Sequence, residues 1–334
     1  LIESIMSPET IQNDGPNGIY SYPLGQYANT DKASTDPCAV DANDPNLAYK
    51  FGTMANETVI AQTFNKDLAN EYGKICGNYS LWSNLTIFWG CGTNLHRTPY
   101  NARNHEYYSE DAVLTSGQAV AFISGGKEYG VIIAPKHLAF NDTEINRTGV
   151  SVFMTEQQAR ENELRGTQAS IEDAGALGIM TAFNRVGITA ANAHTGLLKN
   201  ILRGEWGFKG LESQDFIMNP NYAVLKEYAL NGGTMTTFTG ENTMAAVSEK
   251  FAYWTTENVG QDTELMGAIK QAMTWQAYAL ANSNALDGMA SSTRLVSVRT
   301  WYDNALVAVQ VVFAALTVLA AAMYVLNDRK SKKQ

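Results

Sequence analysis

The chain has 334 residues and a formal net charge of -9, with 45% hydrophobic and 17% charged residues. These proportions are typical of a globular protein with a full core, and they argue against a disordered chain. Lys and Arg form no stripe before the last residues, so the phosphate-neutralising surface of a nucleic-acid-binding protein is missing and we expect no nucleic-acid partner. No linker-like stretch divides the sequence, so we expect one globular domain over residues 1–300.

The three cysteines, Cys38, Cys76 and Cys91, are not arranged with CxxC spacing. No cluster of Cys and His has the spacing of a metal site either, so we expect no metal ion and no cofactor. The odd count is consistent with one disulfide and one free thiol, and equally with three free thiols.

Helical and strand-like patterns alternate along the globular part. Residues 58–75 place six apolar side chains on one helical face: Val59, Ile60, Phe64, Leu68, Tyr72 and Ile75. Apolar runs with the length and β-branched content of buried parallel strands stand at residues 85–89, 131–134 and 179–182, and a weaker fourth run stands at residues 211–214. Thr155 and Gln158 form a capping box that predicts a helix reaching about residue 174.

This alternation predicts an α/β fold with a parallel sheet, either a closed barrel or an open doubly wound sheet. Neither GxGxxG nor GxxxxGK[ST] follows any of the strands, which disfavours the nucleotide-binding open sheets. In a barrel, functional residues gather where the strands end, and polar residues stand at those places here. They are Asn94, Arg97 and Arg103, then Lys136 and His137, then Asn184 and Arg185, and finally Asp215.

Five motifs follow one another in a fixed order, at residues 13–18, 94–111, 136–147, 180–185 and 198–210, the last leading directly to Asp215. In content and spacing they resemble the signature of glycoside hydrolase family 3, a group with many β-glucosidases and related exo-acting enzymes. The resemblance covers about residues 14–237. It implies a (β/α)8 barrel of the TIM type, allowing for an incomplete N-terminal part.

The resemblance also implies a retaining mechanism, in which a carboxylate attacks the anomeric carbon and a covalent glycosyl-enzyme forms before water releases the sugar. Asp215 matches the family nucleophile; the alternative is a carboxylate that caps the next helix. Five residues match positions that bind the hydroxyls of the terminal sugar: Asp14, Arg103, Lys136, His137 and Arg147. Outside that context Lys136 and His137 would be a buried pair closing a strand end, and Arg147 a surface ion pair.

The chain departs from the family pattern around the nucleophile. Phe183 stands where the family usually has a Tyr whose hydroxyl contacts the nucleophile, and Phe216 stands where a Trp packs on the sugar. We expect both rings to line the substrate site. The strand before Asp215 is polar and carries Glu212, for which the sequence offers no physical reason.

A retaining hydrolase needs a second carboxyl group about 5 Å from its nucleophile. In two-domain relatives a Glu on a second α/β domain supplies it, and the sequence contains no such domain. We therefore expect a companion domain from an upstream segment or a separate chain. The alternative is a surface protein of impaired activity that acts as a glycan-binding or assembly subunit.

Residues 305–326 form an uncharged apolar run, long enough as a helix to cross ~30 Å of hydrocarbon. A buried core helix is the alternative. Trp301 and Tyr302 suit the interfacial belt, and the basic residues 327–334 indicate a cytoplasmic tail, which places the globular domain outside the cell. Residues 1–6 are no signal peptide, so we expect the numbered sequence to begin within a longer precursor.

Overall fold

The computed structural model describes residues 10–16, 54–82, 85–147, 149–216, 224–236, 254–286 and 301–331. The chain divides into two compact units. The larger spans Ser7–Gly288, and the smaller includes Met289–Gln334.

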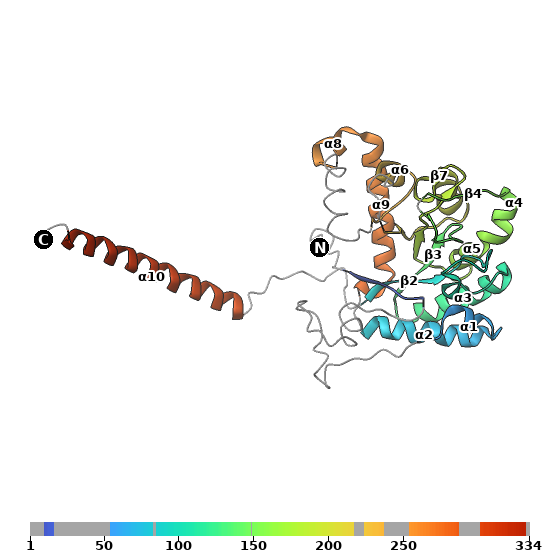
Figure 1. The fold of residues 1–334 in the computed structure, drawn as a ribbon, viewed down its shortest axis with the longest axis horizontal. Coiled ribbons are helices and arrows are strands. Elements are labelled where there is room, and N and C mark those ends of the chain that lie inside the picture. The colour runs from blue at the N-terminus through green and yellow to red at the C-terminus, as the bar shows by residue number, and fades with distance from the viewer. Residues whose placement is uncertain are drawn as a thin grey trace. The chain divides into compact units, whose positions relative to one another are not determined.

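The larger unit is built on a parallel sheet whose strand order follows the chain order (Figure 1). Its strands are β1 (Ile11–Asp14), β2 (Leu85–Gly92), β3 (Ile132–Leu138), β5 (Gly178–Thr181) and β8 (Leu211–Gln214). An isolated parallel bridge from Ser213 to Met235 continues the pairing beyond β8. A strand order that never reverses is the order of a barrel, because a doubly wound sheet changes direction partway.

The four strands predicted from apolar runs are confirmed. The strand β1 was not predicted, because its Ile-Gln-Asn-Asp sequence has no apolar run. The described residues provide five barrel-like strands, so closure into eight remains a prediction.

Helices connect successive strands and cover the outer face of the sheet, and further helices follow the last strand. They are α1 (Glu57–Ala61), α2 (Lys66–Trp82), α3 (Ala112–Lys127), α4 (Glu156–Gln158), α5 (Arg165–Glu172), the π-helix η5 (Gly196–Glu205), α6 (Leu225–Leu230), α8 (Thr256–Gln261) and α9 (Thr263–Ala281). Of the helices after the last strand, α9 packs Ala279 and Leu280 on the inner face. Thr155 caps α4 by accepting from the N–H of Gln158 at 3.2 Å, which confirms the predicted helix start. A π-helical stretch, Ala159–Glu163, joins α4 towards α5.

The single helix predicted over residues 58–75 is wrong. The chain leaves α1 after Ala61, and the side chain of Asn65 then accepts from two N–H groups at the start of α2. Phe64, at the break, has a φ of 53° and a side chain that is 76% exposed. Of the six residues on the predicted face, Ile60 and Tyr72 are buried, and the other four are exposed.

The buried face of α2 consists mainly of small residues, because α2 packs very closely against α3. A Cβ added at Gly73 would lie 2.0 Å from the carbonyl oxygen of Phe122, and one added at Gly125 would lie 2.2 Å from that of Asn70. The two helices therefore meet at the level of their backbones. Large apolar side chains at these positions would force them apart.

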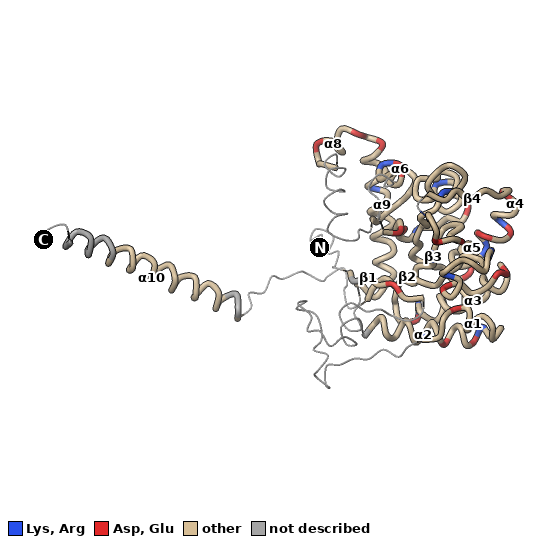
Figure 2. The backbone as a smooth tube through the Cα atoms, viewed as in Figure 1, with Lys and Arg blue, Asp and Glu red and all other residues tan. Residues whose placement is uncertain are grey.

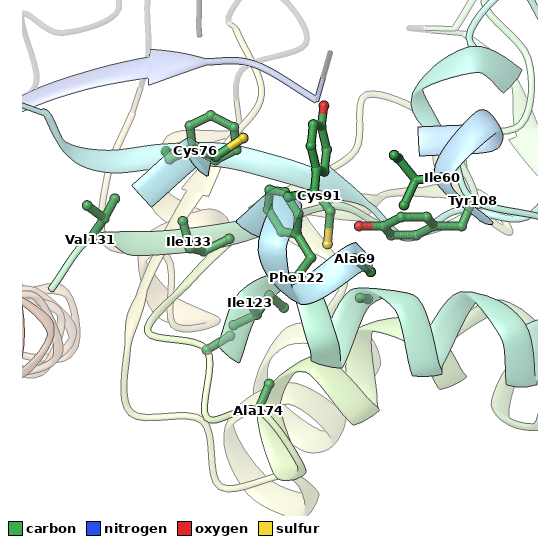
Figure 3. Close-up of a cluster of buried hydrophobic side chains, with 14 of the residues drawn as sticks. Ile60, Ala69, Cys76, Cys91, Tyr108, Phe122, Ile123, Val131, Ile133 and Ala174 are labelled. Carbon is green, nitrogen blue, oxygen red and sulfur yellow. The ribbon is translucent and has the colours of Figure 1, made fainter. Parts of the chain in front are cut away.

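An apolar core fills the space between β2, β3 and these helices (Figure 3). The ring of Phe122 lies 5.4 Å from that of Tyr72 and 6.0 Å from that of Phe88. Cys76 and Cys91 are buried in this core as free thiols, and burial raises the pKa of both. Cys38 lies outside the described residues.

A second apolar cluster occupies the inner face of the sheet and includes Ile87, Trp89, Ile132, Ala134, Met180 and Leu211. Side chains alternate between the two faces along a strand. By this alternation Lys136 on β3 lies on the inner face, two residues after Ala134. Asp215 lies on the same face, two residues after Ser213. Glu212 points to the opposite, helix-covered face, where its backbone oxygen accepts from the hydroxyl of Tyr228 at 2.9 Å.

The smaller unit contains α10 (Trp301–Ser331). Its segment Asn304–Met323 has a mean hydropathy of 2.4, and Figure 2 shows the middle of the helix without charged residues. Among the described helices it is the one long and apolar enough to cross a membrane. The predicted span of residues 305–326 lies within α10, and the helix continues into the predicted tail. Insertion into a membrane remains a prediction.

Candidate active site

Three strand ends bring the first charged groups of the site together. Asp14 ends β1 beside Trp89 of β2, and Lys136 on β3 lies between Gly92 of β2 and Met180 of β5. Asp215 follows β8 directly, and its N–H donates to the carbonyl oxygen of Thr181 at 3.2 Å. Parallel strands end at the same edge of the sheet, so these side chains share that edge.

Lys136 is buried and lies between two carboxylates. Its side chain is 1% exposed, and its Nζ lies 2.5 Å from Oδ1 of Asp14 and 3.9 Å from Oε2 of Glu106. The side chain of Asp14 is 48% exposed. The lysine charge is therefore compensated from one side by a carboxylate that still reaches solvent.

Two arginines are held by carboxylates in the loops after β2 and β3. Arg103 makes a two-pronged contact with Glu106, at 3.2 Å from Nε and 2.6 Å from Nη2, and its Nη1 lies 3.6 Å from Glu144. Arg147 donates to the other oxygen of Glu144 at 2.7 Å. Its guanidinium also stacks on the ring of Phe183 at 4.3 Å. Bidentate pairing of this kind fixes the orientation of a guanidinium group.

His137 is fixed at its backbone and on both ring nitrogens. Asn94 accepts from its N–H and donates to its carbonyl oxygen, both at 2.9 Å. On the ring, Nδ1 lies 3.2 Å from the hydroxyl of Tyr107, and Nε2 lies 3.4 Å from Oδ2 of Asp215. Burial, together with Arg103 and other nearby cations, holds the pKa of His137 well below its usual value, so the imidazole is neutral.

Asp215 is buried, with a side chain 8% exposed. Burial raises its pKa to about 6, although Lys136, the N–H of Phe216 and two arginines act to lower it. The N–H of Phe216 donates to Oδ1 at 2.8 Å. The carboxylate is therefore ionised at neutral pH in a largely desolvated position, which favours nucleophilic reactivity.

The structure thus joins seven of the eight predicted site residues through direct contacts. Asp14, Lys136, Arg103, Arg147 and Phe183 are joined through Glu106 and Glu144, and His137 contacts Asp215. Tyr107 and Asn141 link these two groups through hydrogen bonds to His137 and Glu144. Phe216 is next to Asp215 in the chain, and its ring is 39% exposed. Among the described ring contacts none involves that ring.

The sequence reasoning missed Glu106, Glu144, Tyr107 and Asn141. All four lie inside the motifs at residues 94–111 and 136–147. Glu106 and Glu144 each stand three residues from an arginine that they bind, a spacing that favours pairing within a turn. That spacing could have indicated them.

Two observations delimit the site. Among the described residues no group of three His, Cys, Asp or Glu side chains could hold a metal ion. A cavity of about 490 Å³ lies elsewhere, between the α4 region and η5, and none of the eight predicted site residues lines it.

An ordered parallel sheet with a buried carboxylate and opposing cations at its carboxyl edge is the arrangement of α/β-barrel enzymes that act on polar substrates. The sequence model of the glycosyl hydrolase family 3 N terminal domain matches residues 46–234. The chain belongs to this family.

Individual relatives agree with this assignment. The chain is 32% identical over 203 residues to a probable beta-glucosidase J of Emericella nidulans, covering 61% of this chain and 21% of that protein. It is 36% identical over 159 residues to the beta-glucosidase BoGH3A of Bacteroides ovatus, covering 48% of this chain and 21% of that one. The chain thus spans about a fifth of the length of these curated relatives.

Solved structures show the same fold. Beta-glucosidase 3B of Thermotoga neapolitana, in complex with glucose, superposes with a TM-score of 0.69 at 26% identity, covering 83% of this chain and 36% of that one. The parallel sheet corresponds to a curled half-barrel, consistent with a TIM-like barrel.

Proposed function

We propose that this chain is the nucleophile-bearing barrel of a retaining exo-β-glycosidase that removes terminal, glucose-like residues. The observation that carries this proposal is the position of Asp215, a buried carboxylate 3.4 Å from His137 in a network with three cations. The relatives at 32% and 36% identity are named beta-glucosidases, which supports the substrate class.

In the proposed reaction Asp215 attacks the anomeric carbon, and the covalent glycosyl-enzyme is then hydrolysed. The carboxylate needs no partner base, because it is ionised above a pKa of about 6. Lys136, Arg103 and Arg147 offer donors to sugar hydroxyls, and Asp14 offers an acceptor whose side chain is 48% exposed. Charged donors and acceptors of fixed orientation suit a ligand covered with hydroxyl groups.

The leaving group must also be protonated, by a second carboxyl group about 5 Å from the first. We assign this role to a companion domain of the family, in the same polypeptide or a separate one. The relatives are about five times as long as the matched region, which leaves room for such a domain in them. We also propose that the half-barrel belongs to a complete (β/α)8 barrel.

For the helix α10 we propose a single membrane span, with the globular unit outside the cell and the basic end in the cytoplasm. The mean hydropathy of 2.4 over Asn304–Met323 supports insertion. The basic residues after it support the orientation. Single cysteines introduced before and after α10, and probed for accessibility from outside intact cells, would test both the insertion and the orientation.

A glycan-binding or assembly role without turnover is the second candidate. It is favoured by Phe183, which replaces the tyrosine that usually contacts the nucleophile in this family and instead stacks on Arg147. In this case the network would bind sugar without forming a covalent bond.

Covalent trapping separates the two candidates. A 2-deoxy-2-fluoro glucoside with a good leaving group needs little acid catalysis, so it reports on the nucleophile even without the companion domain. We expect a glycosyl adduct on the peptide containing Asp215, with labelling slowed by at least about 10⁴-fold in Asp215→Asn. Glu212→Gln, on the opposite face of the same strand, is the matched control and should be labelled. A folded protein without adduct would favour the binding role.

A further inference from the structure

A line of buried polar side chains connects the sugar-facing arginines to Asp215. The amide nitrogen of Asn141 donates to Oε1 of Glu144 at 3.2 Å and to the hydroxyl oxygen of Tyr107 at 2.8 Å. The Tyr107 hydroxyl lies 3.2 Å from Nδ1 of His137, and Nε2 of His137 lies 3.4 Å from Asp215. Asn141, Tyr107 and His137 are all 2% exposed or less.

The donor and acceptor in each hydrogen bond of this line follow from the groups at its two ends, Glu144 and Asp215. Glu144 is a carboxylate that only accepts hydrogen bonds, so the side of the Asn141 amide facing it must be the NH₂ group. The same NH₂ group then donates to the oxygen of Tyr107. The single proton of the Tyr107 hydroxyl is left for its other neighbour, Nδ1 of His137. Burial raises the pKa of Tyr107, so that proton is retained.

The other end gives the same answer independently. A neutral imidazole carries one proton, and its unprotonated nitrogen presents a lone pair. A lone pair on Nε2 would face the carboxylate of Asp215 at 3.4 Å and be repelled, whereas an N–H is attracted. Both ends therefore favour the proton on Nε2 and the lone pair on Nδ1.

We propose that Tyr107 is a positioning residue that holds His137 in the Nε2–H tautomer, so that the imidazole presents an N–H to the carboxylate of Asp215. The relay consists of Glu144, Asn141, Tyr107, His137 and Asp215. It connects Glu144, the carboxylate that binds Arg103 and Arg147, to the reacting group. The relay orients the proton and transfers none.

The tautomer of His137 tests the proposal without reference to activity. The chain has four histidines, so ¹⁵N-histidine labelling gives few signals, which variants of His96, His105 and His194 assign by elimination. In the wild type we expect His137 to carry its proton on Nε2. In Tyr107→Phe the ring remains but the hydroxyl proton is lost, so only Asp215 still favours the proton on Nε2, and we expect the Nδ1–H tautomer to gain a measurable population.

Tyr108→Phe is the matched control. Tyr108 is the adjacent residue and equally buried, but its hydroxyl lies beside Cys91 in the apolar core (Figure 3). It should leave His137 unchanged. Asn141→Leu is a second variant: without the NH₂ group the proton of the Tyr107 hydroxyl is no longer directed to His137, so the Nδ1–H tautomer should again gain population. A wild-type His137 protonated on Nδ1, or a tautomer that neither variant changes, would overturn the proposal.

The positioning role itself rests on the proposed function and has its own readout. We expect Tyr107→Phe to slow covalent labelling of Asp215 about tenfold, the size of one lost orienting hydrogen bond, with Tyr108→Phe unchanged. An altered tautomer with an unchanged labelling rate would overturn the role of Tyr107. A fixed Nε2–H tautomer in a wild type that is never labelled would instead refute the proposed function.

Discussion

The two faces of the same sheet give buried groups different surroundings. On the inner face, at the strand ends, carboxylates and cations lie in contact, as Lys136 does with Asp14. On the outer face the core is apolar, and helices approach so closely that Gly73 touches the backbone of Phe122. A charge is tolerated on the inner face because an opposite charge and some solvent are near, whereas the outer face excludes solvent.

Glu212 lies on the outer face of β8 and Asp215 lies on the inner face at its end, so these two carboxyl groups allow the faces to be compared directly. Burial raises the pKa of both, that of Asp215 to about 6 and that of Glu212 to about 7. Lys136 leads the cations that act on Asp215, whereas Glu212 has the hydroxyl of Tyr228 and the guanidinium of Arg203 nearby. Arg203 itself donates to the carbonyl oxygen of Gly232 from Nη2 at 2.7 Å and from Nε at 3.2 Å. A raised pKa therefore does not identify the reactive carboxylate, and the surrounding cations do.

The largest effect on the outer face should come from Phe122→Ala. Phe122 is fully buried and packs on two aromatic rings, so its loss leaves a cavity in the core. We expect the free energy of unfolding to fall by about 3–5 kcal/mol in chemical denaturation. Covalent labelling of the folded fraction should stay the same, because the inner face is not touched. Lost labelling in the folded fraction would show that the two faces are not independent.

A somewhat smaller effect is expected for Glu212→Gln, and it depends on pH. The folded-state pKa of Glu212 is about 7, above its ordinary value, so the folded protein binds a proton that the unfolded chain releases as pH rises. Stability is therefore lost between about pH 4.5 and pH 7, by on the order of 3 kcal/mol. Gln cannot ionise, so the variant should match the wild type at pH 4 and exceed it at pH 8. An equal difference at both pH values would contradict this account.

The smallest of these effects concerns the inner face. Labelling of the wild type should increase as pH rises through about 6, because the carboxylate of Asp215 must be ionised. Lys136 is the first of the groups that lower this pKa, so Lys136→Met should move the inflection upward by about one pH unit. Lys136→Arg keeps the charge and should leave it near 6. The inflection is the relevant measurement, since the rate also reflects sugar binding.

The sequence predicted four of the strands and eight candidate site residues, seven of which the fold brings together, and it failed where packing decided the outcome. The prediction of the buried face of α2 was wrong because amphipathic periodicity assumes large buried side chains. Instead, α2 buries Ala69, Gly73 and Cys76 against α3. Glu212 appeared unexplained because Tyr228 and Arg203, the groups near it, come from segments that no local pattern places beside β8. In a sheet covered by helices both faces are buried, and an outward carboxyl can lie among helix side chains.

Within the site, motif resemblance identified Asp215, Lys136 and His137, but it did not reveal what holds them. The roles of Tyr107 and Asn141 depend on which atoms face one another across residues far apart in sequence. Such directions are set by the folded backbone, and no local pattern carries them. By contrast, the pairing of Arg103 with Glu106 follows a three-residue spacing and could have been predicted.

We propose that a sugar binds at the inner-face network around Asp215. Calorimetric titration with a cationic, glucose-configured iminosugar tests it most directly, because such a ligand places its charge next to the carboxylate. We predict binding to the wild type and to Glu212→Gln with equal affinity, and a loss of about 100-fold or more in Asp215→Asn. Equal binding by Asp215→Asn, or no binding by the folded wild type, would contradict the account.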